Sequence, residues 1–270
     1  MRRSSAVATL GMAVAPLLAG PVAARAQGEG GSALPWSATL FYDAQEIART
    51  PEAAYWHTVT AGVAARVPHG SIGVQVMATR RFDLSDQAVI VDAYHDLWGG
   101  AYGNLRVGGA PGAEVLARFD AGAELFQAVG RGELSASYRF QSFEASDVST
   151  LGAGLGYYAG NWYLRPRTVV AHVDEAWSPF VAFTARRYFG DTTDNLIDLA
   201  SGMGEEVLEV AAPATGAGPL DVITSGSRFA SLRAQRYIGR HFGVTAGVSY
   251  SDYAEIPNRW GMSLGLLARW

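Results

Sequence analysis

The sequence predicts an all-β protein that crosses a membrane as an antiparallel transmembrane β-barrel of about fourteen strands, with twelve as the alternative count. Three observations lead to this fold class: short segments that alternate apolar and polar residues, an N-terminal segment with export features, and a chain end that is apolar at alternate positions and closes on an aromatic residue. Charged residues make up only 17%, against about 25% in soluble domains. No single long apolar stretch accounts for this deficit, which argues against a helical membrane protein.

The first 26 residues are expected to be a cleaved signal peptide. Arg2 and Arg3 precede an apolar run from Ala6 to Val22, and Ala24-Arg25-Ala26 forms a small-x-small cleavage site. A permanent N-terminal anchor is the alternative, but the run is short for a membrane span. We therefore expect a signal peptide over 1–26, a short N-terminal segment over 27–35 and the barrel over 36–270.

Charge and cysteine content exclude several classes of function. The formal net charge is −4, and removal of residues 1–26 takes away arginines but no acid, so the mature chain is more acidic still. Nucleic-acid binding, which needs a basic patch, is not expected. The chain has no cysteine, which excludes disulfide scaffolds, thiolate metal sites and cysteine nucleophiles.

The strand prediction depends on strict alternation, which is clearest from Glu133 to Gln141. A helix cannot place alternate residues on opposite faces, whereas a strand does so automatically. One face carries only apolar or aromatic residues, namely Leu134, Ala136, Tyr138 and Phe140. The other face is polar throughout.

We count fourteen such segments, separated by turn residues such as those of 67–70, 98–100, 110–112, 159–161 and 190–191. One of them is expected over 114–124. The segments are centred near residues 40, 60, 76, 92, 104, 120, 138, 154, 166, 184, 198, 233, 246 and 264.

The composition of the two faces favours a membrane barrel over a soluble β-sandwich or barrel. A soluble sheet has a wet face rich in charge. Here one face is small or aliphatic, and the other is glycine, hydroxyl, arginine and carboxylate, which is the apolar-outside pattern of a membrane barrel. With an even strand count and both termini in the periplasm, the longest loop, roughly Met203 to Ser225, falls outside the cell.

Aromatic residues gather near segment ends, which is typical of the interfacial girdles of membrane barrels. They are Trp36, Tyr55, Trp56, Trp98, Tyr102, Trp162, Trp177, Tyr188, Trp260 and Trp270. The last segment resembles the terminal strand that barrel assembly machinery recognises. Its expected assembly signal is Leu264, Leu266, Ala268 and Trp270.

Polar positions on the alternating segments define the expected lumen-lining residues. They are Arg81, Asp92, Asp96, Arg118, Asp120, Glu133, Arg139, Arg165, Arg167, Arg186 and Arg233. Such residues serve a selective polar channel or a glycan-contacting surface. In the other interpretation they pair across neighbouring strands and fill the barrel, and fourteen strands lie between the packed and the open cases. The sequence leaves this open, with a slight preference for a largely filled interior.

No catalytic, cofactor-binding or metal-binding residues are assigned, and no cofactor is expected. His69 and His241 fall in predicted turns, His57 and His172 lie toward the outer rim, and His95 and Asp96 are consecutive, so they face opposite sides of a strand. The glycine-rich stretch 152–156 continues a strand and opens no helix, so it lacks the context of a phosphate loop. The acids Glu205, Glu206, Glu209 and Asp221 match no calcium-loop spacing.

Several stretches resemble the YaiO family of outer-membrane β-barrel proteins. They are 160–167, 186–191 with 202–206, Val91-Asp92-Ala93-Tyr94 before a Trp-Gly turn, and the ending from Arg236 to Trp270. The resemblance implies a barrel in the outer membrane and no established reaction. Similar barrels sit beside or within polysaccharide export systems, so glycan passage is a further expectation of the resemblance.

The sequence thus leads to an exported bacterial outer-membrane barrel, expected to be monomeric. We expect a passive channel or an accessory of envelope or polysaccharide export, and not an enzyme. The alternatives are an outer-membrane enzyme acting on lipid or peptide, and a structural or adhesive barrel with a filled lumen. The expected partners are outer-membrane lipid and the barrel assembly machinery, with polysaccharide as a further candidate and no nucleic acid.

Overall fold

The computed structural model describes residues 8–9, 34–47, 54–81, 84–190, 193–211, 221–254 and 257–270. Within these residues no helix is long and apolar enough to cross a membrane. The expected signal peptide lies outside the described residues except for Ala8–Thr9, which form a two-residue strand, β1, paired with Val210 and Ala211. The expected segment 27–35 is described only at residues 34 and 35.

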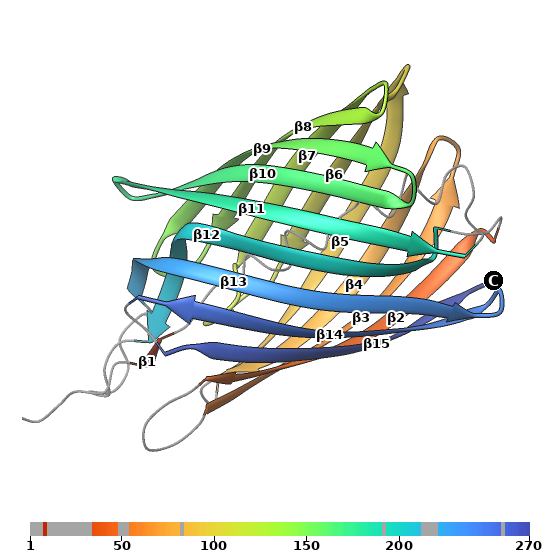
Figure 1. Ribbon diagram of the computed structural model, residues 1–270. Coiled ribbons are helices and arrows are strands. Elements are labelled where there is room, and N and C mark those ends of the chain that lie inside the picture. Colours follow the sequence, from red (N-terminus) through yellow and green to blue (C-terminus); the bar gives the residue numbers. More distant parts are fainter. Residues whose placement is uncertain are drawn as a thin grey trace, which may run out of the picture.

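The described chain folds into one antiparallel sheet that closes into a barrel of fourteen strands, β2 to β15 (Figure 1). Every strand pairs with its neighbours in sequence, and the barrel closes where β15 pairs with β2. The strands are β2 (Trp36–Ile47), β3 (Ala54–Val67), β4 (Gly70–Arg81), β5 (Leu84–Trp98), β6 (Ala101–Gly109), β7 (Phe119–Val129), β8 (Gly132–Ser142), β9 (Asp147–Ala159), β10 (Trp162–Val173), β11 (Ala176–Phe189), β12 (Asn195–Ala211), β13 (Asp221–Ile238), β14 (Phe242–Tyr253) and β15 (Arg259–Arg269).

The prediction of fourteen strands rather than twelve is confirmed, and each predicted centre falls within a strand. Closure satisfies the backbone of every strand without an exposed edge, as a sheet in lipid requires. At the closing seam, the register continues to the very end of the chain. Trp36 and Trp270 exchange two backbone hydrogen bonds, each 3.1 Å between nitrogen and oxygen.

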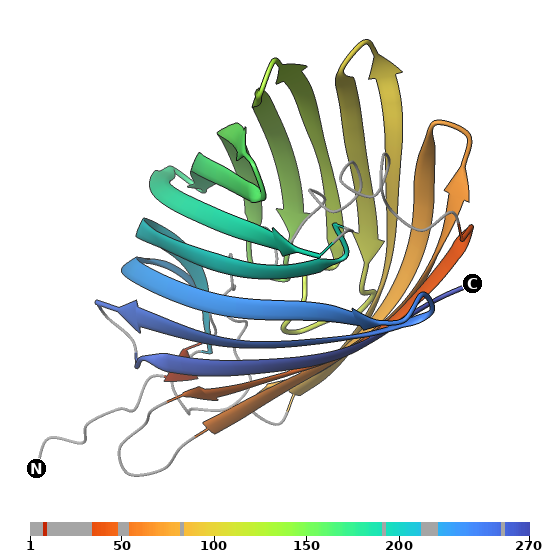
Figure 2. The same ribbon diagram turned by 45° about the vertical axis from the view of Figure 1, so that its right-hand side comes forward.

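The two ends of the barrel differ in their connections (Figures 1 and 2). At one end, here the short-turn end, two residues link β3 to β4, β5 to β6, β7 to β8 and β9 to β10. Gly100 has a φ of 75° in one of these turns, a conformation that glycine adopts without steric cost. The first residue of β2 and the last of β15 also lie at the short-turn end. The opposite end, the long-loop end, holds the connection 110–118, the last residue of β12 and the first residue of β13.

The predicted strand over 114–124 is wrong in its first five residues. β7 begins at Phe119, and residues 110–118 form a loop at the long-loop end. The physical reason is the Asp86 carboxylate on β5, which accepts backbone N–H groups of Glu114, Val115 and Leu116 at 2.6–3.2 Å. These donors are therefore unavailable to a sheet, and the loop buries Val115 against Trp56.

The predicted loop from Met203 to Ser225 is also wrong in extent. β12 continues to Ala211 and β13 starts at Asp221, with a ladder that runs from Leu196 opposite Gln235 to Val210 opposite Asp221. Ladder pairing satisfies the backbone of this stretch in the same way as in the rest of the sheet. Only 212–220 separates the two strands, and it lies outside the described residues.

Candidate functional site

The candidate site is the inner face of the barrel, which the alternation of exposure separates from the outer face. Along β8, Leu134, Ala136 and Tyr138 are exposed, whereas Glu133 is buried and Ser135 is partly buried. Contacts between strands that are not neighbours give a second way to recognise inward side chains. Such side chains can meet only across the concave face. Glu133 on β8 meets this condition, since it contacts Tyr102 on β6 and Tyr163 on β10.

Glu133 forms the first of three polar clusters on the inner face of β5 to β13. Tyr102 and Tyr163 each donate their hydroxyl hydrogen to one of its carboxylate oxygens, both at 2.9 Å. Tyr102 also stacks on Phe126 with ring centroids 4.5 Å apart. A carboxylate that accepts two buried donors is well satisfied, so this cluster fixes three strands relative to one another near the short-turn end.

Arginines of β10 occupy the space beside this cluster. Arg165 donates to Glu124 at 2.5 Å and to Ser135 at 2.8 Å, while Arg167 donates to Ser137 at 2.8 Å. Both arginine side chains are buried. They lie across β9, where the glycine-rich stretch 152–156 continues a strand as expected.

A second cluster is centred on Asp120 of β7. Arg139 of β8 binds it with two nitrogens, at 2.7 and 2.6 Å, and Arg106 of β6 donates to it at 3.2 Å. Arg106 also lies 3.5 Å from Asp92 of β5. Two-nitrogen arginine–carboxylate pairs hold a fixed geometry, so these side chains are oriented along the wall and bind each other.

The third cluster extends the pattern to β13. Arg186 of β11 binds Asp198 of β12 at 2.5 and 2.9 Å, and Arg233 of β13 donates to the same carboxylate at 2.5 Å. We call the inner face of β5 to β13 the charged wall. Its charged members are Asp92, Arg106, Asp120, Glu124, Glu133, Arg139, Arg165, Arg167, Arg186, Asp198 and Arg233.

The inner face of the remaining strands, β14, β15 and β2 to β4, has a different character, and we call it the hydroxyl wall. Its inward positions are mostly glycine, serine and threonine, with Asp43 as a carboxylate at mid-height. Most of these hydroxyl side chains are partly exposed, although Thr79 and Thr245 are buried, whereas six of the eleven charged members of the charged wall are buried. The partly exposed hydroxyl residues are Thr39, Thr58, Thr60, Ser71, Ser249, Ser251 and Ser263.

Eight of the eleven predicted lumen-lining residues lie on the charged wall. Arg81, Asp96 and Arg118 do not join it. Arg118 lies in the 110–118 loop and pairs with Glu144 at 2.9 Å, so its predicted position on a strand is wrong. Asp96 is exposed at the short-turn end, beside an irregularity in the pairing of β5 with β6. Arg81 ends β4 at the long-loop end and lies over the Trp56 ring.

Sequence reasoning missed three charged members of these clusters, Arg106, Glu124 and Asp198. Arg106 and Glu124 share the parity of polar inward residues on their own strands, Asn104 and Asp120. Asp194, a buried acid outside the clusters, gave no such signal. Asp194 lies before β12 and pairs with Arg269 of β15 at 2.9 Å across the short-turn end. Its partner is far away in sequence, so alternation alone could not reveal the pair.

Several aromatic residues of the predicted girdles face inward. Trp56 and Tyr102 are 2% and 4% exposed, and Tyr188 is partly buried. The remaining seven residues of the predicted girdles are at least 42% exposed, as an interfacial position requires. The predicted assembly-signal residues Leu264, Leu266 and Trp270 are exposed on the outer face, and Ala268 is intermediate.

The histidines do not form one group, although the rings of His69 and His95 lie edge to face with centroids 6.4 Å apart. His69 and His241 lie in short-turn connections, and His95 is exposed near the end of β5. His57 accepts or donates a 2.7 Å hydrogen bond with the Tyr42 hydroxyl, and His172 packs on Trp177. Among the described residues, no group of three or more His, Asp or Glu side chains is placed to hold a metal ion. Glu209 and Asp221, two of the acids considered for calcium, have side chains outside the described set.

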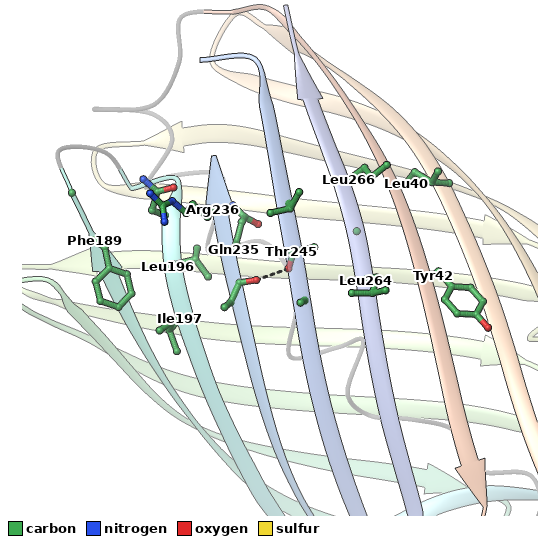
Figure 3. Close-up of a pocket in the computed structure, with 16 residues that line it drawn as sticks. Leu40, Tyr42, Phe189, Leu196, Ile197, Gln235, Arg236, Thr245, Leu264 and Leu266 are labelled. Carbon is green, nitrogen blue, oxygen red and sulfur yellow. Dashed lines mark hydrogen bonds between the residues drawn. The ribbon is translucent and has the colours of Figure 1, made fainter. Parts of the chain in front are cut away.

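A groove of about 980 Å³ lies on the outer face, in the half nearer the short-turn end (Figure 3). It runs over β11 to β15 and β2 and is lined by outward residues such as Leu40, Ile197, Leu264 and Leu266, with Arg236 also contributing. These side chains have the parity of the lipid-facing set. The groove is therefore lined mainly by the outer face, and the inward-parity residues Leu196, Gln235, Thr245 and Gly265 complete its lining.

Comparison with known proteins identifies the family. The model of the YaiO membrane beta barrel domain matches residues 39–207, from β2 into β12. The resemblance noted for the ending from Arg236 to Trp270 lies outside that match and stays a prediction. A search of the curated proteins gave no match.

Solved structures of outer-membrane barrels share the fold. A deletion mutant of TodX, a monoaromatic hydrocarbon channel, aligns with a TM-score of 0.56 and 8% identity, covering 98% of this chain and 96% of its own. An outer-membrane channel from Pseudomonas putida F1 aligns with a TM-score of 0.51 and 8% identity, over 89% and 97%. The barrel geometry, the apolar outer face and the family match agree, so this chain belongs to the YaiO membrane β-barrel family and is an outer-membrane β-barrel.

Proposed function

We propose that this protein is a passive channel for small polar solutes, whose path follows the hydroxyl wall. The observation that carries the proposal is the partial exposure of inward side chains in the middle of that wall, such as Thr60 and Ser263. Partial exposure of hydroxyl side chains on the concave face supports a solvated path along this wall.

The charged wall supports the same interpretation. Its arginines and acids bind one another, so their long side chains are held against the barrel wall and leave the opposite side free. Side-chain hydroxyl groups both donate and accept hydrogen bonds, so they can replace water around a neutral, hydroxyl-rich solute. Related folds in the TodX channel and the Pseudomonas channel are compatible with conduction, although the likeness extends to fold alone.

The absence of cysteine offers a direct test. Ser263→Cys introduces a single thiol on the hydroxyl wall, and a cationic thiol-specific reagent should then reduce the conductance measured in planar bilayers. The matched control is Leu264→Cys, the next residue on β15, which is exposed on the outer face. The reagent should leave the current of the control unchanged.

Two results would contradict the proposal. An unmodified barrel that inserts but passes no current would show a filled interior, and the structural role considered above would replace the channel. Equal responses of Ser263→Cys and Leu264→Cys would show that the current does not follow the hydroxyl wall.

A further inference from the structure

A cationic cluster lies at the long-loop end of the hydroxyl wall. Arg259 begins β15, and its guanidinium carbon lies 4.7 Å from the centroid of Trp56 on β3 and 4.5 Å from that of Tyr253 on β14. Arg81, the last residue of β4, lies over the same indole at 4.9 Å. Two guanidinium groups therefore share one aromatic ring at the mouth of the barrel.

Two of the three guanidinium nitrogens of Arg259 have no hydrogen-bond acceptor. They are Nε and Nη2, and the residue is only 4% exposed. A guanidinium is planar and its donors radiate from the edge. The rings of Trp56 and Tyr253 attract the positive charge of the guanidinium through cation–π interactions. These interactions satisfy none of the N–H donors at its edge.

The charge of Arg259 also lacks a direct counter-ion. Within the part of the chain that the structure describes, no carboxylate lies within 4.0 Å of its nitrogens. Glu206 of β12 is the acid whose charge acts on both Tyr253 and Arg259, but it forms no ion pair with Arg259. Every arginine of the three clusters described above, in contrast, binds a carboxylate or a serine hydroxyl.

We infer that Arg259, with Arg81 beside it, forms a binding site for an oxyanion at the long-loop mouth of the barrel. A buried guanidinium with two free edge donors is complementary to a carboxylate or phosphate group, which accepts two parallel N–H bonds. The hydrophobic rings on either side raise the strength of such a contact because they exclude water. The ligand class is a small solute that carries a carboxylate or phosphate, such as an acidic sugar.

The position favours a soluble ligand over a lipid headgroup. Arg259, Gly261 and Ser263 are alternate residues of β15, so all three face inward. Lipid contacts the opposite face of the strand. The inference goes beyond the proposed channel, because binding at the mouth does not require passage through the barrel.

The test is calorimetric titration of the full-length barrel, refolded in detergent without lipopolysaccharide, with inorganic phosphate and with glucuronate. Glucose serves as the neutral probe. We expect both anions to bind and glucose not to bind. Arg259→Gln should weaken anion binding by about tenfold or more, because it removes a charge-assisted contact.

Two further variants separate the site from general effects. Arg228→Gln removes an exposed arginine on the outer face of β13 and should leave binding unchanged. Arg259→Lys keeps the charge but loses the planar fork, so it should bind anions with intermediate affinity. Heat-modifiable migration establishes that each variant is folded before titration.

Four results would overturn the inference: no anion binding by the native barrel, equal binding by Arg259→Gln, equal loss in Arg228→Gln, or equal binding of glucose. Competition by added lipopolysaccharide would assign the site to a lipid phosphate and would also overturn it. A barrel that binds phosphate but carries no current would contradict the channel and leave this site standing. A barrel that conducts, but whose Arg259→Gln variant binds phosphate as tightly as the native protein, would support the channel and contradict the anion site.

Discussion

Glycines of β9 determine how the arginines of β10 lie against the charged wall. A Cβ at Gly154 would come within 2.7 Å of the Ser135 hydroxyl and 3.2 Å of Arg165 Nε, and one at Gly152 would meet Ser137 and Arg167 in the same way. The missing side chains therefore create the room in which two guanidinium groups pass over a strand. This is a packing role for glycine within a strand.

Replacement of Gly154 by valine should destabilise the barrel by about 1–3 kcal/mol, since the new side chain must displace Arg165 from Glu124. Urea unfolding of the protein in detergent measures this change. The control is Ala153→Val, on the neighbouring position that is exposed on the outer face. Equal stability of the two variants would mean that Arg165 has an alternative position of similar energy.

Ala136 and Arg139 on β8 test the assignment of outer and inner faces. Ala136→Arg places an unpaired guanidinium in lipid near mid-strand, at a cost of about 2–4 kcal/mol at the bilayer midplane. We expect a marked loss of folded, heat-modifiable protein in the outer membrane. Arg139→Ala should assemble much better, because Arg106 still contacts Asp120. Equal assembly defects would contradict the assignment.

Sequence parity predicted the orientation of individual residues well where a strand is regular. It placed Arg139, Arg165 and Arg186 on the polar face, and all three are inward. It could not predict which carboxylate each would bind. Asp194 and Arg269, for instance, meet across the short-turn end from the ends of β12 and β15, two strands that are not neighbours in the sheet.

At the scale of elements, the 110–118 loop shows how one carboxylate can replace a stretch of sheet. Asp86 accepts three consecutive backbone N–H groups and thereby holds the loop against β5. The stretch 114–118 resembled a strand because the apolar Val115 and Ala117 lie between the charged Glu114 and Arg118 at alternate positions. The alternation arose from the loop's packing on Trp56, and a local pattern cannot distinguish the two causes.

Asp86→Asn should release this loop without unfolding the barrel, because the amide accepts hydrogen bonds less strongly than a carboxylate. Trypsin should then cleave after Arg118 faster than in the native protein, as followed by mass spectrometry of the fragments. Asp96→Asn is the matched control on the same strand, since Asp96 is exposed and lies at the opposite end. Unchanged cleavage in Asp86→Asn would mean that the loop is held mainly by its apolar contacts.

β15 is the element on which assembly is expected to depend. Leu266→Asp places a charge on its outer face, and deletion of Trp270 removes the residue that pairs with Trp36, so both should block insertion. Leu266→Val keeps the outer face apolar and should assemble normally. The fraction of heat-modifiable protein in the outer membrane measures all three. Normal insertion of Leu266→Asp would mean that this position does not contact lipid.

For the whole molecule, the two walls give the barrel an unequal interior. The charged wall holds paired arginines and acids over nine strands, and the hydroxyl wall carries partly exposed hydroxyl side chains over five. The sequence predicted the strand count and the closed sheet, because fourteen alternating segments can be satisfied in lipid only by closure. It could not predict that the charges would segregate to one side, since this depends on which inward residues become neighbours around the ring.

Because β2 pairs with β15 as regularly as any other two neighbours, the ring has no structural beginning. The pairing of the strands does not mark β2 as the first or β15 as the last. Only the covalent order of the chain does so. A circular permutant could join the present ends with a short linker and open the chain between β12 and β13, so that β12 becomes terminal. Such a molecule should refold in detergent to the same ring, yet fail to insert in cells if the machinery reads the free end that Trp270 now provides.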